Sequence, residues 1–128
     1  MAQNQVIISL GSNIRPVINM GMAVEHLHRY FSIVSVSSFI STKPIGITDQ
    51  PDFLNGVIKL ETPKTKEEVK AILKQIEDAM GRDRTAPKFG PRSIDLDVLI
   101  WNGQVVDDDY YTRDFLQNLV AEIRDDGL

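Results

Sequence analysis

The sequence predicts an α+β fold, in which a ferredoxin-like βαββαβ sandwich carries an added C-terminal helix. Two observations predict the sandwich. Strand-like and helix-like segments follow one another in the order of two split βαβ units, and each helix-like segment has one apolar face. A third observation concerns size: at 128 residues, 42% hydrophobic and 25% charged, the chain is typical of one globular domain, residues 1–128.

The first half of the chain supplies a strand, a helix and a second strand. Residues 5–10 (QVIISL) form a short apolar run typical of a buried strand, and we expect the turn 11–13 (GSN) to end it. Pro16 suits the first turn of a helix. Apolar residues then recur at spacings of four, three and four: Met20, Val24, Leu27 and Phe31. The β-branched run 33–40 (IVSVSSFI) predicts the next strand.

A third strand and a second helix follow. Residues 53–61 (FLNGVIKLE) predict the strand. Thr65 and Glu68 form a capping-box pattern that opens the helix, and Gly81 is a typical C-terminal stop. The apolar stripe of this helix consists of Val69, Ile72, Leu73, Ile76 and Met80.

The fourth strand carries two acidic residues. From Ile94 to Ile100 every second residue is Ile, Leu or Val, and Asp95 and Asp97 stand between them. Because side chains alternate along a strand, both carboxylates point to the same side. Residues 109–123 predict a last helix, whose core side consists of Leu116, Leu119, Val120 and Ile123.

The two faces of the predicted sheet have different roles. In a ferredoxin-like sandwich the helices cover one face and leave the other available. The residues expected to meet the helices are Leu54, Ile58, Leu96 and Val98. The residues expected to emerge together on the open face are Phe53, Asn55, Asp95 and Asp97.

Composition excludes several classes of protein. The absence of cysteine excludes a disulfide framework, zinc–thiolate sites, Fe–S clusters and a thiol nucleophile. A net charge of −4 argues against nucleic-acid binding. No apolar run approaches a membrane span and the N-terminus lacks a signal-peptide pattern, so we expect a cytoplasmic protein. Basic residues are concentrated in one segment, which favours a small anionic ligand: Arg82, Arg84, Lys88 and Arg92.

The acidic strand and the basic segment together suggest phosphoryl chemistry. Asp95 and Asp97 suit Mg²⁺, which takes one or two carboxylates plus substrate phosphates. Arg82 and Arg92 can donate forked hydrogen bonds to phosphate oxygens. Taken separately, the acids or the basic segment would be read as solvated surface, and their adjacency favours function. We interpret residues 107–109 (DDD) as a solvated turn and helix cap.

Several segments, taken in order, resemble one enzyme family. They are GSN at Gly11, TKPIG at Thr42, QPDFLN at Gln50, E…GRDR from Glu77 to Arg84, FGPRSIDLD at Phe89, and the RDF at Arg113. They resemble 6-hydroxymethyl-7,8-dihydropterin pyrophosphokinase of folate synthesis. The resemblance implies a magnesium-dependent enzyme that moves pyrophosphate from ATP, its co-substrate, to the hydroxymethyl group of the pterin and releases AMP.

The resemblance also implies roles for individual residues. Asp95 and Asp97 would hold two Mg²⁺ ions, and Arg82 and Arg92 would stabilise the transferred group. The residues implied for ATP are Glu77, Arg82, Arg84, Lys88, Arg92, Val98 and Arg113. The residues implied for the pterin are Thr42, Lys43, Ile45, Phe53, Asn55 and Phe115, with the two phenylalanines clamping the ring.

Two other functions stay open at this point. One is a shortened paralogue that binds a pterin without efficient transfer. The other is a nucleotidyltransferase that uses the same acidic pair and releases pyrophosphate. We expect a monomer without nucleic-acid or membrane partners, and a helper chain that completes the site is left open.

Overall fold

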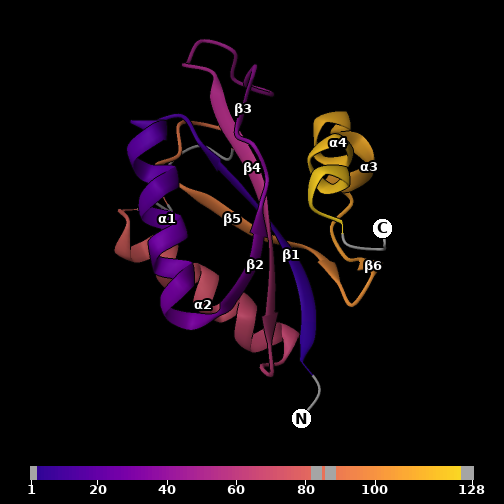
Figure 1. Ribbon diagram of the computed structural model, residues 1–128. Coiled ribbons are helices and arrows are strands. Elements are labelled where there is room, and N and C mark those ends of the chain that lie inside the picture. The colour runs from indigo at the N-terminus through magenta and orange to yellow at the C-terminus, as the bar shows by residue number, and fades with distance from the viewer. Residues whose placement is uncertain (1–2, 82–84, 86–88, 125–128) are drawn as a thin grey trace.

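The computed structural model describes residues 3–81, 85 and 89–124, and these residues form an α+β fold around one antiparallel sheet (Figure 1). The sheet has six strands in the order β2-β4-β1-β5-β6, with β3 also paired to β4. The elements are β1 (Asn4–Ser12), α1 (Pro16–Tyr30), β2 (Ser32–Val36), β3 (Ile40–Thr42), β4 (Phe53–Thr62), α2 (Lys66–Ala79), β5 (Asp95–Trp101), β6 (Gln104–Val105), α3 (Asp109–Thr112) and α4 (Asp114–Ile123).

Helices α1 and α2 cover one face of the sheet, as the sequence predicts (Figure 1). Their apolar stripes pack on alternate residues of β1, β4 and β5 in one buried cluster, which includes Ile8, Ile58, Leu96 and Val98. The predicted capping box at Thr65 is present. The Thr65 side chain accepts a hydrogen bond from the Glu68 backbone N–H, and the Glu68 carboxylate accepts one from the Thr65 N–H.

The opposite face of the sheet is not open along its length, so this part of the prediction is wrong. Helix α4 packs across the middle of it (Figure 1). The stripe predicted from the sequence is buried there: Leu116, Leu119, Val120 and Ile123. This face of the sheet is itself apolar at Ile7, Val57 and Leu99, so burying the two surfaces together removes both from water.

Several predicted boundaries also differ from the structure. The predicted strand 33–40 is two strands, because the chain leaves the ladder after Val36 and pairs with β4 again at Ile40. The predicted helix 109–123 is interrupted at Arg113, whose extended backbone separates α3 from α4. Strand β1 continues through Gly11 and Ser12 instead of ending in a turn there.

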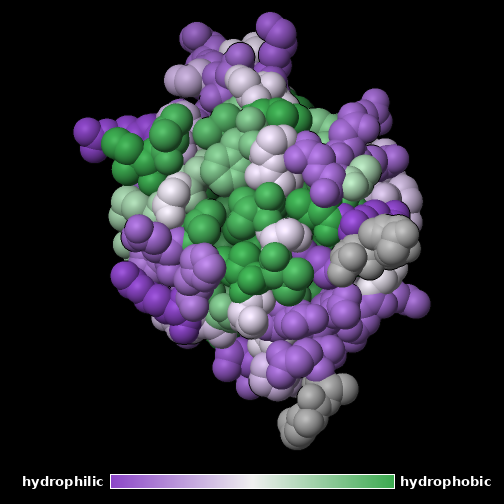
Figure 2. Space-filling view, in the orientation of Figure 1, coloured by the Kyte–Doolittle hydropathy of each residue, from purple (hydrophilic) through white to green (hydrophobic). Residues whose placement is uncertain are grey.

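Strand β2 forms one edge of the sheet and leaves apolar side chains uncovered. Figure 2 shows a hydrophobic area in the middle of the face on which β2 lies in Figure 1. Val34, Val36 and Phe39 are between 36% and 46% exposed. A register shift between Ile33 and Ser35 makes this edge irregular, and irregular edges pair poorly with other chains.

No helix in the described part of the chain has both the length and the apolar character to cross a bilayer.

Candidate active site

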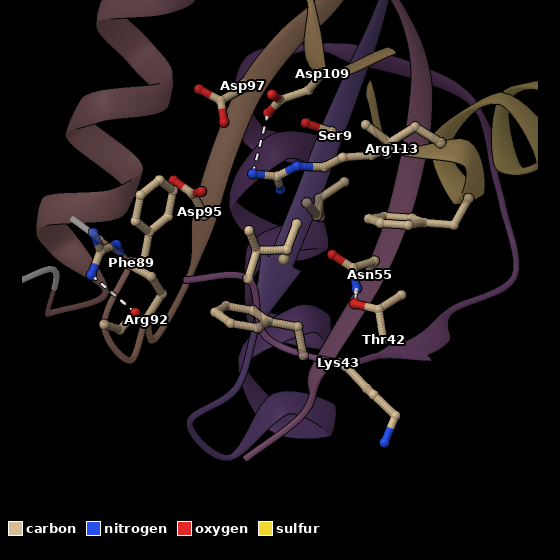
Figure 3. Close-up of a pocket in the computed structure, with 17 residues that line it drawn as sticks. Ser9, Thr42, Lys43, Asn55, Phe89, Arg92, Asp95, Asp97, Asp109 and Arg113 are labelled. Atoms are coloured by element: carbon tan, nitrogen blue, oxygen red, sulfur yellow. Dashed lines mark hydrogen bonds and ion pairs between the residues drawn. The ribbon is translucent and has the colours of Figure 1, made fainter. Parts of the chain in front are cut away.

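A cavity of ≈ 320 Å³ lies on the α4 side of the sheet (Figure 3). It is lined by every residue that the family resemblance implies for the pterin: Thr42, Lys43, Ile45, Phe53, Asn55 and Phe115. It is also lined by several of the residues assigned to phosphates and metal: Arg92, Asp95, Asp97 and Arg113. The fold therefore brings residues of β3, β4, β5 and α4 around one space.

Asn55 is the buried polar residue of this cavity, with 8% of its surface exposed. Its amide nitrogen donates a hydrogen bond to the Thr42 hydroxyl on the neighbouring strand β3. Gly11 of β1 lies directly opposite Asn55, and a Cβ atom at Gly11 would stand 3.1 Å from the Asn55 Oδ1 atom. Glycine at this position therefore leaves the Asn55 carbonyl oxygen uncrowded, as an acceptor for a ligand.

Two half-buried phenylalanines provide flat apolar surface beside this amide. Phe53 is the first residue of β4, and Phe115 lies in the first turn of α4. Lys43 and Ile45 extend the wall along the loop after β3, and both are exposed to solvent. A flat heteroaromatic ring gains from contact with such rings beyond the burial of its area.

Phe89 lines the same cavity and was not among the predicted site residues. It packs against the loop after β3 at Gly46, where a Cβ atom would come within 2.9 Å of the Phe89 ring. Gly46 also has a φ of 82°, a conformation that favours glycine. The contact joins the loop after β3 to the segment before β5, and no local pattern in the sequence indicates it.

The two acidic residues of β5 lie side by side, as predicted. Asp95 and Asp97 are paired across the strands with Gly11 and Ser9 of β1, and Figure 3 shows both carboxylates beside the cavity. Ser9 and Gly11 also line the cavity, although the sequence analysis did not include them. Alternation of side chains along β1 would have predicted that Ser9 and Gly11 share one sheet face, and their pairing with β5 makes it the face of the two acids.

Asp97 lies in a strongly acidic environment. Burial among protein atoms, followed by the charge of Asp95, raises the pKa of Asp97 to about 7. Three further carboxylates act in the same direction: Asp107, Glu77 and Asp109. Solvent reaches the outer side of Asp97, which is exposed at the surface, so part of this repulsion is screened.

This acidic environment fits a hard divalent cation, which carboxylate oxygens bind well. Within the described part of the chain, no three His, Cys, Asp or Glu side chains are close enough to enclose a metal ion by themselves. A cation held by Asp95 and Asp97 therefore needs further oxygen ligands, such as phosphate groups and water.

Glu77 of α2 is buried, with only 4% of its surface exposed. Its carboxylate accepts a hydrogen bond of 2.8 Å from the backbone N–H of Leu96, the residue between the two acids. Glu77 therefore fixes the start of β5, in addition to lining a cavity.

Arg92 is buried, and its backbone is fixed by the segment after β1. Its N–H donates to the Asn13 side chain at 2.8 Å, and its carbonyl oxygen accepts from the Asn13 N–H at 3.1 Å. Its guanidinium donates to the backbone oxygens of Gly90 and Pro91, each at 3.2 Å. The GSN segment thus positions an arginine that lies far away in the sequence.

One of the acidic residues before α4 lines the cavity, a position that the interpretation of 107–109 as a solvated turn and helix cap did not include. Asp107 does cap the turn, because its side chain accepts a hydrogen bond from the Asp109 N–H at 2.9 Å. Asp109, however, lines the cavity and lies 3.7 Å from the Arg113 guanidinium (Figure 3). Burial raises the pKa of Asp109, and Arg113 partly offsets that effect.

A second cavity, of ≈ 500 Å³, lies between α2 and β5. It is lined by the predicted residues Glu77, Asp95, Asp97 and Val98, although Val98 is only 5% exposed. It is also lined by polar residues that were not predicted: Lys70, Lys74, Asp107 and Asp108. Lys70, Lys74 and Glu77 are spaced by four and three residues along α2, which places them on one helix face. From this spacing the two lysines could have been predicted to lie beside Glu77. The acidic pair lines both cavities.

The predicted residues Arg82, Arg84 and Lys88 lie outside the described residues.

Comparison with known proteins places the chain among the enzymes of one family. Residues 7–125 match the profile of the 7,8-dihydro-6-hydroxymethylpterin-pyrophosphokinase family. The chain is 33% identical to the 2-amino-4-hydroxy-6-hydroxymethyldihydropteridine pyrophosphokinase of Bacillus subtilis, over 94% of this chain and 78% of the relative. It is 32% identical to the Haemophilus influenzae protein of the same name, over 93% and 81%.

An Arabidopsis thaliana folate synthesis bifunctional protein is 37% identical, over 76% of this chain and 20% of that longer protein. The chain belongs to the 7,8-dihydro-6-hydroxymethylpterin-pyrophosphokinase family.

Proposed function

We propose that this protein transfers diphosphate from ATP to 6-hydroxymethyl-7,8-dihydropterin and releases AMP, as a step of folate synthesis. The observation that carries the proposal is the position of Asp95 and Asp97, which line both cavities. One cavity offers flat rings and an amide, and the other offers lysines and acids. A metal–phosphate group at the acidic pair would meet an acceptor in the first cavity and a nucleotide in the second.

The first cavity suits the pterin. Phe53 and Phe115 would contact the two faces of the ring. Asn55, fixed by Thr42, would present its carbonyl oxygen to the N–H groups on the pterin edge. Ile45 and Lys43 would close the outer wall. In this orientation the hydroxymethyl group would point toward the acidic pair, which also lines the cavity.

The second cavity suits ATP. Val98 and Glu77 would lie beside the nucleotide, and Lys70 and Lys74 would offset the charge of its phosphates. Arg113 lines the first cavity and would exchange Asp109 for a phosphate oxygen. Arg92 would donate to the transferred group. The roles of Arg82, Arg84 and Lys88 at the phosphates rest on the family resemblance.

Asp95 and Asp97 would hold Mg²⁺, and we propose two ions. Mg²⁺ held there would offset the charge of the triphosphate and polarise its phosphoryl oxygens. In the reaction, the hydroxymethyl oxygen forms a bond to the β-phosphorus of ATP. The bond from that phosphorus to the oxygen shared with the α-phosphate breaks, and AMP leaves with that oxygen while the hydroxyl proton passes to water. The protein's own contribution is position and charge.

We further propose that residues 1–128 form a single ferredoxin-like domain that acts as a monomer. The antiparallel order β2-β4-β1-β5, with α1 and α2 on one face, supports the ferredoxin-like arrangement. A cytoplasmic location stays a prediction.

The test is incubation of the protein with Mg²⁺, ATP and 6-hydroxymethyl-7,8-dihydropterin, followed by analysis of the nucleotide and pterin products. We expect AMP and the pterin diphosphate ester in equal amounts. Release of pyrophosphate would indicate the nucleotidyltransferase instead. Pterin binding without any AMP would indicate a non-catalytic paralogue. Omission of the pterin controls for ATP hydrolysis.

A further inference from the structure

A third cavity, of ≈ 220 Å³, lies on the same sheet face as the proposed pterin site but beyond the other end of α4. It shares no lining residue with the two cavities described above. Its walls come from β1, β4, β5, the β5–β6 turn, β6 and α3, together with Arg124, the residue that ends α4. Family resemblance and the proposed reaction assign nothing to this cavity.

Lys59 is the feature that calls for an explanation. It lies on β4 opposite Ile7 of β1, and only 9% of its surface is exposed. Within residues 3–81, 85 and 89–124, the side chain of Lys59 makes no hydrogen bond or ion pair. The ammonium itself still reaches solvent, because among the described residues only Ser93 Oγ is a buried side-chain polar atom without a partner, so an anion in the cavity can pair with Lys59.

The surroundings of Lys59 combine positive charge with apolar surface. Arg124 contributes a second cation at the cavity, and Gln5 contributes an amide. Ile7, Ile100, Val105 and the ring of Tyr110 form the apolar part of the wall. The nearest acidic residue along the same strand face is Glu61, two residues further on, and it does not line the cavity.

We propose that this cavity binds a small organic oxyanion, whose carboxylate or phosphate accepts hydrogen bonds from Lys59 while its apolar body contacts Ile7, Val105 and Tyr110. The volume is below the roughly 300–1,000 Å³ of cavities that hold drug-sized ligands, so the ligand is small. Convergent polar groups in an otherwise apolar pocket are the usual pattern of a ligand site.

A structural role for Lys59 is the competing explanation. Arg124 ends α4 beside the same cavity, so Lys59 lies near the carboxyl end of this helix, where positive charge is stabilising. That role requires no ligand. It predicts that replacing Lys59 lowers stability and changes the binding of no small molecule.

The experiment uses the full chain, benzoate as the probe and benzamide as its neutral counterpart, with amide chemical shifts recorded by NMR during titration. We expect benzoate to shift resonances of Ile7, Gly103, Val105 and Tyr110 while those of Gly11 and Asn55 stay in place. Benzamide should bind at least about tenfold more weakly, because it lacks the charge that Lys59 would pair.

Two matched variants locate the interaction. Lys59→Met should weaken benzoate binding by about tenfold or more. Lys66→Met, the same change at a half-buried position of α2 that lines none of these cavities, should leave the affinity unchanged. If the Lys59→Met variant does not fold, Lys59→Gln is used in the same titration, with the same expected result.

Four results would overturn the proposal. They are no shifts at saturating benzoate, shifts confined to the proposed pterin site, equal binding of benzamide, and undiminished binding by the Lys59 variant. None of these outcomes depends on whether the protein transfers diphosphate.

Discussion

At the scale of single residues, Asp97 is a proposed metal ligand whose negative charge destabilises the protein when no cation is bound. Its charge is opposed by Asp95 and three other carboxylates, so the free protein holds it in an unfavourable state. Such an arrangement is expected where a cation binds during function, because the bound cation offsets the charges that repel one another. Removal of the charge should therefore affect activity and stability in opposite directions.

The first prediction concerns activity. Asp97→Asn should reduce diphosphate transfer about a hundredfold or more, because it removes a charged oxygen ligand from the proposed metal site. Far-UV circular dichroism should show an unchanged fold. Glu67→Gln, at an exposed position in the first turn of α2, is the matched control and should keep full activity. Normal turnover by Asp97→Asn would contradict the metal assignment.

The second prediction concerns recognition of the pterin. Asn55→Ala should weaken pterin binding about tenfold or more, because it removes the buried acceptor and leaves the pterin N–H groups unpaired. The pterin affinity of both proteins can be measured by titration calorimetry in the presence of a non-hydrolysable ATP analogue. Asn118→Ala, on the exposed side of α4, is the control. A variant that binds pterin as tightly as the original would mean that Asn55 serves only to hold Thr42.

At the scale of the elements, two helices hold the site through defined hydrogen bonds. Glu77 of α2 fixes the start of β5 at Leu96, between the two acids. Glu122 of α4 accepts hydrogen bonds from the backbone and hydroxyl of Ser38, at 2.8 and 2.7 Å, which join α4 to the connection between β2 and β3. The positions of α2 and α4 against the sheet are therefore fixed by these hydrogen bonds as well as by their buried apolar faces.

The third prediction tests the contact between α2 and β5. Glu77→Leu should lower the free energy of unfolding by about 1–3 kcal/mol, because it leaves the buried Leu96 N–H without an acceptor. It should also weaken Mg²⁺–ATP binding, since Asp95 and Asp97 flank Leu96. Glu77→Gln keeps an acceptor oxygen and should lose less. Urea unfolding and nucleotide titration measure the two effects, and unchanged stability of the leucine variant would argue against this positioning role.

The fourth prediction tests helix capping. Thr65→Ala should lower the free energy of unfolding by about 1 kcal/mol, because the N–H of Glu68 loses its acceptor and the capping box is broken. Thr65→Ser keeps the hydroxyl and should be nearly neutral. Activity at low denaturant should be the same in both variants, because α2 is anchored by its buried stripe. The measurement is urea unfolding, and equal losses in the two variants would show that the hydroxyl contributes nothing.

At the scale of the whole molecule, the acidic cluster makes stability depend on pH in a direction unusual for a carboxylate. The folded protein raises the pKa of Asp97 to about 7, whereas an unfolded aspartate has a pKa of about 3.9. Between these values the folded state binds the proton more tightly than the unfolded state. The contribution of Asp97 to stability is therefore present at low pH and is lost as the pH rises to about 7.

The fifth prediction follows from that sign. In metal-free buffer, the original protein should lose stability relative to Asp97→Asn between about pH 4 and about pH 7, by about 1 kcal/mol after allowance for solvent screening. Urea midpoints of the two proteins at several pH values measure the difference, and the groups common to both cancel. A constant difference across this range would show that Asp97 titrates normally.

Much of the site could be predicted because strand alternation is a local rule. Phe53, Asn55, Asp95 and Asp97 do share one sheet face, and the predicted pterin residues do line one cavity. Phe89 was missed because its contact with Gly46 joins two distant segments, and no spacing of residue types predicts such a contact. Asp109 lies four residues before Arg113, which is a helical spacing, and it was missed because residues 107–109 were interpreted as a solvated turn.

The sequence by itself determined which side chains face together, where α2 begins, and the family of the chain. These properties follow from periodicity, from capping patterns and from motifs, which are all written in short segments. Only the tertiary structure decided that α4 lies across the second sheet face and divides it into two cavities, one with Asn55 and one with Lys59. The physical reason is that an apolar helix stripe specifies the need for burial and does not specify which apolar surface will cover it.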